Sequence, residues 1–215
     1  ELDDYLPGDD LAPVVARPRP TPVQRDVPLE ADCLRALLRK PELYYLVNRR
    51  FRELAEDADD LERGPLGPLC ADDFTHSQYR ALMINFLEAV AQEDMEPFDY
   101  LHERLEGDLR AEMEVIMTDQ WERLRQKVGF EQDLTMTRRQ VERSLTPTNA
   151  INEVVYAALT LRVRRLIAEM QGIVFLQMDE QNDEEGAGSF AQQVNALRAA
   201  RYRIDRALQQ GVQTF

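Results

Sequence analysis

Residues able to bind a metal or transfer protons are few in this sequence. Its 215 residues include two histidines and two cysteines. Asp99-x-x-His102 is the nearest approach to a ligand motif, but a di-iron carboxylate bundle needs two Glu-x-x-His motifs. Cys33 and Cys70 have neither the spacing of a zinc site nor the density of a secreted disulfide framework. We therefore expect reduced cysteines, no metal, no cofactor and no catalytic residue.

Other motifs that carry chemistry are also missing from the sequence. We find no glycine-rich phosphate loop, no nucleophile elbow and no Cys-x-x-Cys. The acidic runs 57–62 and 179–185 could attract a cation weakly, but such runs are usually solvated loops. An all-α enzyme that uses carboxylates and a metal is a competing interpretation. The scarcity of histidine weighs against it, and metal analysis of the purified chain would test it.

The composition indicates an all-α protein. Hydrophobic residues make up 44% of the chain, charged residues 31%, and glycine only nine positions, which favours helices over a turn-rich β protein. The net charge is −14, and residues 1–146 account for −13 of it, with 19 basic and 32 acidic side chains. Because nucleic-acid affinity depends on Lys and Arg displacing counterions, we expect no tight direct nucleic-acid binding.

Three segments can be distinguished along the chain. Residues 1–26 contain five prolines among charged and small residues, which is typical of an extended linker. With the missing initiator Met, this leads us to expect a fragment of a longer protein. Residues 27–146 are predicted to form a helical bundle, and residues 147–215 a long helix and a C-terminal antiparallel helical hairpin. No apolar run approaches the roughly 20 residues that cross a bilayer, and the start is unlike a signal peptide, so we expect no membrane and a cytoplasmic location.

Apolar residues recur every three or four positions through the predicted bundle, which is the helical period. The strongest pattern, over 79–90, follows Thr75 and Gln78, which we interpret as a capping box. Pro41 and Pro97 fit the first position of a helix, where the missing N–H costs nothing. The predicted helices cover about 28–38, 41–54, 79–90, 97–105, 107–128 and 137–145, with a break at 57–69.

The last seventy residues predict two long helices folded back on each other. The first begins at Thr146-Pro147, a cap followed by proline at the first helical position, and continues to about Asp179. The stretch "DEEGAGSF" (183–190) is the expected tip, with a capping box that starts at Ser189. Both helices carry an apolar seam with the spacing of a coiled coil. The seams are Leu159, Val163, Leu166, Met170 and Ile173, and Phe190, Val194, Leu197, Arg201, Ile204 and Leu208.

The predicted hairpin carries residues suited to protein contacts. An isolated helical pair is only marginally stable, because helices in water depend on packing. Large apolar, aromatic and arginine side chains are enriched where proteins meet. We therefore predict a partner-binding surface here, with packing on the bundle as the alternative for each residue, and hairpin-mediated self-association where no partner is present. The candidates are Phe175, Leu176, Met178, Phe190, Leu197, Arg201, Tyr202 and Phe215.

Four stretches stand out for their order and spacing. They are "PLEADCLRALLRKPELYYLVN" (28–48), "DDFTHSQYRALMINFLEAV" (72–90), "LTLRVRRLIAEMQ" (159–171) and "SFAQQVNALRAARYRIDRAL" (189–208). The first two are similar to an "E..L.ALL..PEL" helix and a "DF...YR.L" helix, and the last two to a long helix and a final hairpin. Over about 28–210, the chain resembles the C-terminal helicase-binding domain of bacterial DNA primase of the DnaG type.

This resemblance implies a non-catalytic domain that binds and stimulates the hexameric replicative DNA helicase, with the hairpin supplying much of the docking surface on the helicase's N-terminal domain. In the family, the zinc-binding and polymerising domains precede a linker, so the full-length protein would be a DNA primase, which is a DNA-directed RNA polymerase. The setting would be the primosome at the replication fork in the bacterial nucleoid. The acidic insert 57–69 and the segment 129–140 depart from the family pattern.

Two further interpretations stay open. The N-terminal domain of the replicative helicase is a similar helical bundle, but a helicase would continue into an ATPase, whereas this chain ends in the predicted hairpin. A helical nucleic-acid adaptor is the other alternative, since arginines are dense in the last seventy residues, although their usual role is a solvated or salt-bridged face. These arginines are Arg162, Arg164, Arg165, Arg198, Arg201, Arg203 and Arg206.

Overall fold

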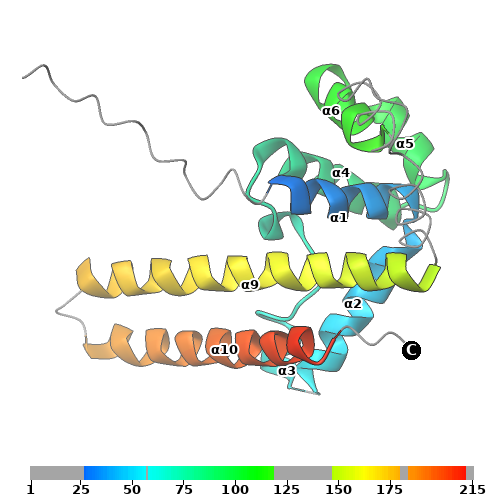
Figure 1. Ribbon diagram of the computed structural model, residues 1–215. Helices are drawn as coiled ribbons and strands as arrows, with labels where there is room; N and C mark the ends of the chain where they lie inside the picture. The colour runs from blue at the N-terminus through cyan, green and yellow to red at the C-terminus, as the bar shows by residue number, and fades with distance from the viewer. Residues whose placement is uncertain (1–26, 57, 119–146, 180–183, 212–215) are drawn as a thin grey trace, which may run out of the picture.

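The computed structural model describes residues 27–56, 58–118, 147–179 and 184–211, which contain helices and connecting loops but no strand. The all-α prediction is therefore confirmed for this part of the chain. Figure 1 shows a bundle beside two long antiparallel helices. The helices are α1 (Val27–Arg39), α2 (Glu42–Ala55), α3 (Asp59–Glu62), the 3-10 helix η2 (Ala71–Asp73), α4 (Ser77–Ala91), α5 (Pro97–Arg104), α6 (Gly107–Met117), α9 (Pro147–Asp179) and α10 (Glu184–Gln209).

Four helices of the bundle, α1, α2, α4 and α5, form where the apolar periodicity predicts them, whereas α3 forms inside the predicted break at 57–69 and buries Leu61. In α1 the buried residues are Cys33, Leu34, Leu37 and Leu38, which recur at the helical period. Pro41 directly precedes α2 in a helical conformation, and α5 has proline at its start, because proline fits the first turn of a helix. Helix α4 buries its predicted face as well. Its core residues are Tyr79, Leu82, Met83, Phe86 and Ala89.

The N-terminus of α4 is capped differently from the prediction. The Thr75 side chain does not cap the helix; instead, its hydroxyl donates to the carboxylate of Glu30 in α1. The same carboxylate accepts the backbone N–H groups of Thr75 and His76, each at 3.0 Å. Glu30 is completely buried, so a negative charge from another helix satisfies donors at the positive end of α4. This long-range contact replaces the predicted Thr75–Gln78 capping box.

Helix α9 is part of both the bundle and the hairpin. It begins and ends at the predicted residues, Pro147 and Asp179. Along its first half, residues 154–162 are almost all buried against α1, α2, η2 and α10, and they belong to the same hydrophobic cluster as the core of α1 and α4. The boundary that we predicted at residue 147 thus separates two parts of the chain that share one core.

The seam between α9 and α10 follows the predicted spacing with one exception. Leu166, Ile173, Leu197 and Ile204 are buried between the helices. Arg201, predicted as a seam residue, is exposed and pairs with Asp205 at 3.4 Å. The small residues Ala200 and Ala207 are buried on that side of α10, because a long charged side chain is costly to bury where alanine lets the helices approach.

Two predicted helix boundaries are wrong. Helix α10 begins at Glu184, five residues before the expected cap at Ser189, so much of "DEEGAGSF" is helical. Helix α6 ends at Met117, since Thr118 has an extended conformation, whereas the prediction continued to residue 128. Three predicted segments lie outside the described residues. They are the linker 1–26, the helix 137–145 and the connection between α9 and α10 at 180–183.

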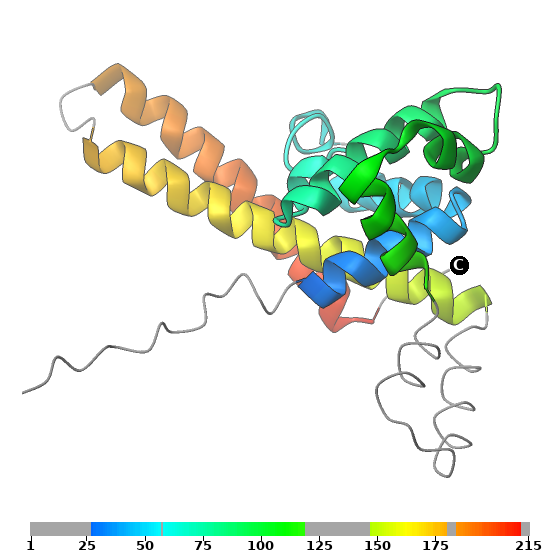
Figure 2. The same cartoon turned by 90° about the horizontal axis from the view of Figure 1, so that it is seen from above.

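The two arms of the hairpin extend beyond the bundle at one end. Figures 1 and 2 show this projecting end, which we define as residues 171–179 of α9 and 184–193 of α10, on the far side from the start of α9. None of the helices in the described ranges combines sufficient length and apolar character to span a bilayer.

Candidate partner-binding surface

The hairpin is anchored to the bundle by a buried ion pair. Arg162 of α9 is 1% exposed and donates to both carboxylate oxygens of Asp73, at 2.6 and 2.9 Å. Its remaining donors reach the carbonyl oxygens of Pro65, Gly67 and Pro68 at 2.8 to 2.9 Å. These five hydrogen bonds use the five N–H donors of a guanidinium, so one side chain holds α9, η2 and the loop 65–68 together.

Aromatic and charged neighbours complete this anchor. The guanidinium carbon of Arg162 lies 4.4 Å from the ring centroid of Phe51 in α2, a cation–π contact that gains strength when it is desolvated. The backbone N–H of Cys70 donates to Asp73 at 2.9 Å, and Arg165 lies 3.7 Å from the same carboxylate. The buried charge of Asp73 is therefore fully compensated, which is what a buried carboxylate requires.

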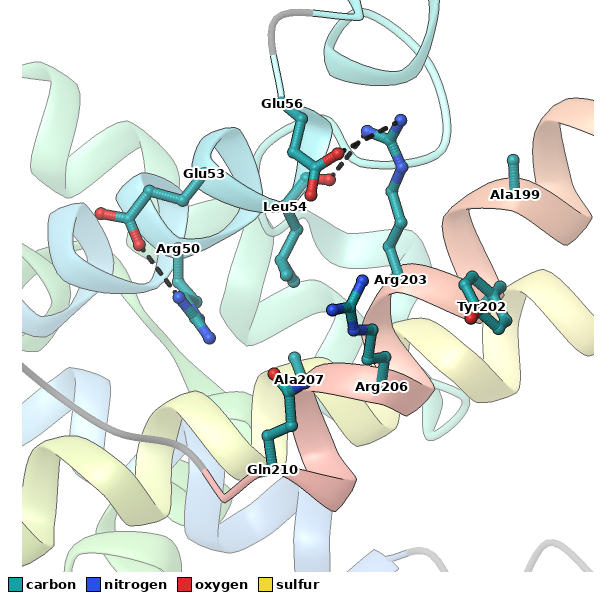
Figure 3. A pocket seen from close by; sticks show the side chains of 10 residues that line it. All are labelled: Arg50, Glu53, Leu54, Glu56, Ala199, Tyr202, Arg203, Arg206, Ala207 and Gln210. Carbon is teal, nitrogen blue, oxygen red and sulfur yellow. Dashed lines mark hydrogen bonds and ion pairs between the residues drawn. The ribbon is translucent and has the colours of Figure 1, made fainter.

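A second contact fixes α10 to the bundle. Arg203 donates to the carbonyl oxygens of Leu54, at 3.0 Å, and Ala55, and lies 3.8 Å from the carboxylate of Glu56 (Figure 3). These carbonyls belong to the last turn of α2, where helix carbonyls lack partners and a positive charge is favourable. Arg162 and Arg203 thus hold both arms of the hairpin at its base, and its other end extends away from the bundle.

The projecting end exposes large apolar side chains. Ile173 is buried in the seam, but the next three residues of α9 are exposed: Val174 by 46%, Phe175 by 72% and Leu176 by 52%. Three consecutive exposed apolar residues are unusual on a surface, where isolated ones are normal. They lie where neither the bundle nor α10 covers them, so we identify residues 174–176 as the centre of the candidate partner-binding surface.

The other predicted contact residues are distributed over different surroundings. Leu197 is buried in the hydrophobic core cluster and Phe190 is partly buried against it, so they stabilise the hairpin rather than form an outer surface. Tyr202 is 68% exposed, but it lies beside the end of α2, away from residues 174–176. The side chain of Met178 and all of Phe215 lie outside the described residues.

His102 is exposed on α5, whereas Cys33 is buried in α1 and Cys70 lies just before η2. The described part of the chain contains no group of three or more potential metal ligands. Exposed His102 lies against Arg110, with its Nε2 at 2.8 Å from the guanidinium. Cys33 and Cys70 are free thiols, and burial, followed by the nearby charge of Asp73, raises the pKa of the Cys33 thiol far above its ordinary range.

Sequence reasoning missed the place of Val174 in the exposed patch. It also missed Arg162 and Arg203 as the residues that anchor the hairpin to the bundle. Val174 does not belong to the predicted seam, so the heptad spacing did not select it. Its position beside Phe175 and Leu176, in a run of three apolar residues, could have indicated that it belongs to the surface patch. Arg162 and Arg203 were grouped with solvated arginines because charged residues are rarely buried. Their partners are 89 and 148 residues away, so no local pattern reveals them.

Comparison of the chain with protein-family models, with curated proteins and with solved structures finds no match in any of the three. The assignment of a function therefore depends on the geometry of the hairpin and on the sequence resemblance described above.

Proposed function

We propose that this chain is a non-catalytic docking domain that binds and stimulates a hexameric replicative DNA helicase, as the C-terminal domain of a bacterial DNA primase would. Tethering in this way raises the effective concentration of the polymerising domains at the template that the helicase exposes. Coupling primer synthesis to unwinding would then need no chemistry in this domain.

The observation that carries this proposal is the asymmetry of the hairpin. Its base is held by Arg162 and Arg203 through hydrogen bonds to the bundle, while residues 174–176 are exposed at its projecting end. An apolar patch on an already folded helix loses less conformational entropy on binding than an unfolded segment would, which favours affinity. The order of the four primase-like stretches adds support, because both arms of the hairpin are among them.

The charge of the hairpin indicates which kind of partner surface would fit. Residues 179–185 carry five acidic side chains and no basic one, and in the sequence they follow residues 174–176 after two further residues. A complementary surface would therefore combine an apolar pocket for Phe175 with basic residues around it. Such rim charges act mainly on association rate and salt dependence, so we expect binding to the helicase to weaken as the salt concentration rises.

The test is binding to a cognate hexameric helicase, measured by co-elution and by the helicase ATPase rate. We expect the unaltered chain to co-elute and to raise the ATPase rate. Phe175→Glu should abolish both effects while leaving the fold intact, because the side chain is 72% exposed. Tyr156→Ser is the matched control: it removes an aromatic side chain that is 50% exposed on the same helix, but far from the projecting end.

Deletion of residues 147–215 would remove the whole hairpin, but it is not a suitable test of docking. Such a truncation removes Arg162 and the buried residues of the first half of α9, which belong to the common core, so the remainder would unfold for reasons unrelated to docking.

Failure of the unaltered chain to bind the helicase would refute the proposal. Equal loss of binding in Phe175→Glu and Tyr156→Ser would refute the assignment of docking to residues 174–176.

A further inference from the structure

A second surface, independent of the proposed helicase docking, lies between the ends of α2 and α10. It is a groove of about 390 Å³, within the range of about 300 to 1,000 Å³ that small-molecule sites occupy. Figure 3 shows its side chains, which come from the last two turns of α2 and from one face of α10. Its lining residues include Arg50, Glu53, Glu56, Tyr202, Arg203 and Arg206.

The groove contains cationic donors that the described residues leave unused. The guanidinium of Arg50 pairs with Glu53 through one terminal nitrogen at 3.2 Å, and the side chain is 24% exposed, so it is not fully enclosed. Its Nε is buried and has no hydrogen-bond partner in the described ranges, although buried polar groups normally have one. Arg206 forms no ion pair with any other residue that the structure describes. Both guanidinium groups extend into the space between the two helices (Figure 3).

The negative groups of the groove, in contrast, are already paired. Glu53 receives hydrogen bonds from Arg49 at 3.1 Å and from Arg50 at 3.2 Å. Arg203 covers the last carbonyls of α2 and lies 3.8 Å from Glu56. The carbonyls that would repel an anion at this helix end are thus occupied, and the unused capacity of the groove is cationic although the whole chain is acidic.

An aromatic side chain lies one helical turn from Arg206 on α10. Tyr202 precedes Arg206 by four residues, so both lie on one face of α10, and the Tyr202 ring is 68% exposed. Figure 3 places Tyr202 on the far side of Arg206 from Arg50. Guanidinium donors bind phosphate oxygens, and an exposed ring can stack on a base. The spatial order is two guanidinium groups followed by an aromatic ring (Figure 3).

We propose that this groove binds a nucleotide, with its phosphates on Arg50 and Arg206 and its base on Tyr202. A free nucleotide fits better than a long single strand. A strand would continue onto a chain with a net charge of −14, where phosphates are repelled, whereas a nucleotide needs only the groove.

The experiment is calorimetric titration of the intact chain with ATP and UTP at low salt. Arg206→Gln is expected to weaken binding about tenfold or more, since it removes a charge-assisted hydrogen bond. Tyr202→Ala should weaken it by about fivefold or more through lost stacking, and Tyr202→Phe should retain most of the affinity. Arg198→Gln, which changes an exposed arginine on α10 outside the groove lining, should leave the affinity unchanged.

Further titrations separate the nucleotide from other ligands. Tripolyphosphate and adenosine should each bind at least tenfold more weakly than ATP. Tripolyphosphate that binds as well as ATP would overturn the proposal in favour of a simple anion site. Binding of an eight-residue oligonucleotide without binding of ATP would overturn it in favour of a strand, and absence of binding by ATP and UTP at millimolar concentration would overturn it altogether. None of these results depends on whether the chain binds a helicase.

Discussion

Replacing Arg162 by methionine tests how the hairpin is anchored. The substitution keeps an unbranched apolar stem but removes the guanidinium and its five hydrogen bonds. The carboxylate of Asp73 then stays buried, with 0% of its side chain exposed, and its nearest remaining cation is Arg165 at 3.7 Å. Removing one partner of a buried ion pair typically costs about 3 to 5 kcal/mol.

We expect Arg162→Met to lower the free energy of unfolding by about 3 to 5 kcal/mol, a large part of the ~5 to 15 kcal/mol of a typical domain. The loop carbonyls of Pro65 and Gly67 lie on a half-exposed segment, so water can replace their lost donors and they should add little. Contact with Phe51 would be retained in part by the methionine side chain. Urea unfolding followed by circular dichroism measures the change.

The double variant Arg162→Met/Asp73→Asn separates the ion pair from simple loss of packing. Without the buried charge, it should be more stable than the sum of the two single changes predicts, by about 2 kcal/mol or more. Arg198→Met, at an exposed position of α10, should change stability by no more than about 0.5 kcal/mol. A loss below about 1 kcal/mol for Arg162→Met, or strictly additive effects, would refute the reasoning.

Three further predictions concern the core. A thiol reagent at neutral pH should modify the half-buried Cys70 but not the buried Cys33 in the folded chain, and both cysteines in urea. Mass spectrometry of the labelled chain measures this, and modification of Cys33 before Cys70 would contradict the prediction. Because burial raises the pKa of Cys33 above the ordinary value of about 8.5, the folded chain keeps a proton that the unfolded chain releases, so stability should fall by about 1.4 kcal/mol per pH unit above that value. Urea unfolding at pH 7.5, 8.5 and 9.5 measures this slope, and Cys33→Ala should remove it. The same slope in Cys33→Ala as in the unaltered chain would contradict the assignment of the pH dependence to Cys33. Glu30→Ala should cost about 2 to 3 kcal/mol, more than Thr75→Ala, since the carboxylate also accepts two backbone N–H groups; equal losses in urea unfolding would argue against the inter-helix cap.

The sequence predicted the elements whose causes are local. Helix α9 was placed at its observed ends because a threonine cap and proline mark its start and a long apolar seam continues to Asp179. The buried face of α4 followed from the spacing of its apolar residues. In both cases the information lies within one or two helical turns, where periodicity and turn chemistry determine the structure.

The features that sequence reasoning missed depend on contacts between distant residues. The cap of α4 comes from Glu30, 45 residues before Thr75, and outcompetes the local capping box. Arg162 is buried because an acid, three carbonyls and an aromatic ring meet around it, which no spacing along α9 indicates. In the seam of α10, Ala200 is buried at the place predicted for Arg201, one residue later. A spacing of four and three residues does not reveal this shift, because the predicted position is occupied by an arginine and the buried one by a small alanine.

The candidate surface could be predicted only in part. Exposure of Phe175 and Leu176 agrees with their position outside the seam, whereas Leu197 contributes to the packing of the two arms. The difference arises because a helix has one buried face, and only the rotation of α10 against α9 determines which apolar residues belong to it. The sequence did not indicate whether the hairpin packs on the bundle or projects from it, because no spacing along α9 specifies which helix covers it.

Hydrogen exchange of the intact chain, with and without a cognate hexameric replicative helicase, tests the proposed docking most directly. It reports amide protection along the whole chain and requires no substitution. If residues 174–176 dock, the amides of residues 171–176 should exchange more slowly in the complex, and those of α6 should be unaffected. Protection confined to the bundle, with unchanged exchange at the projecting end of the hairpin, would contradict the account.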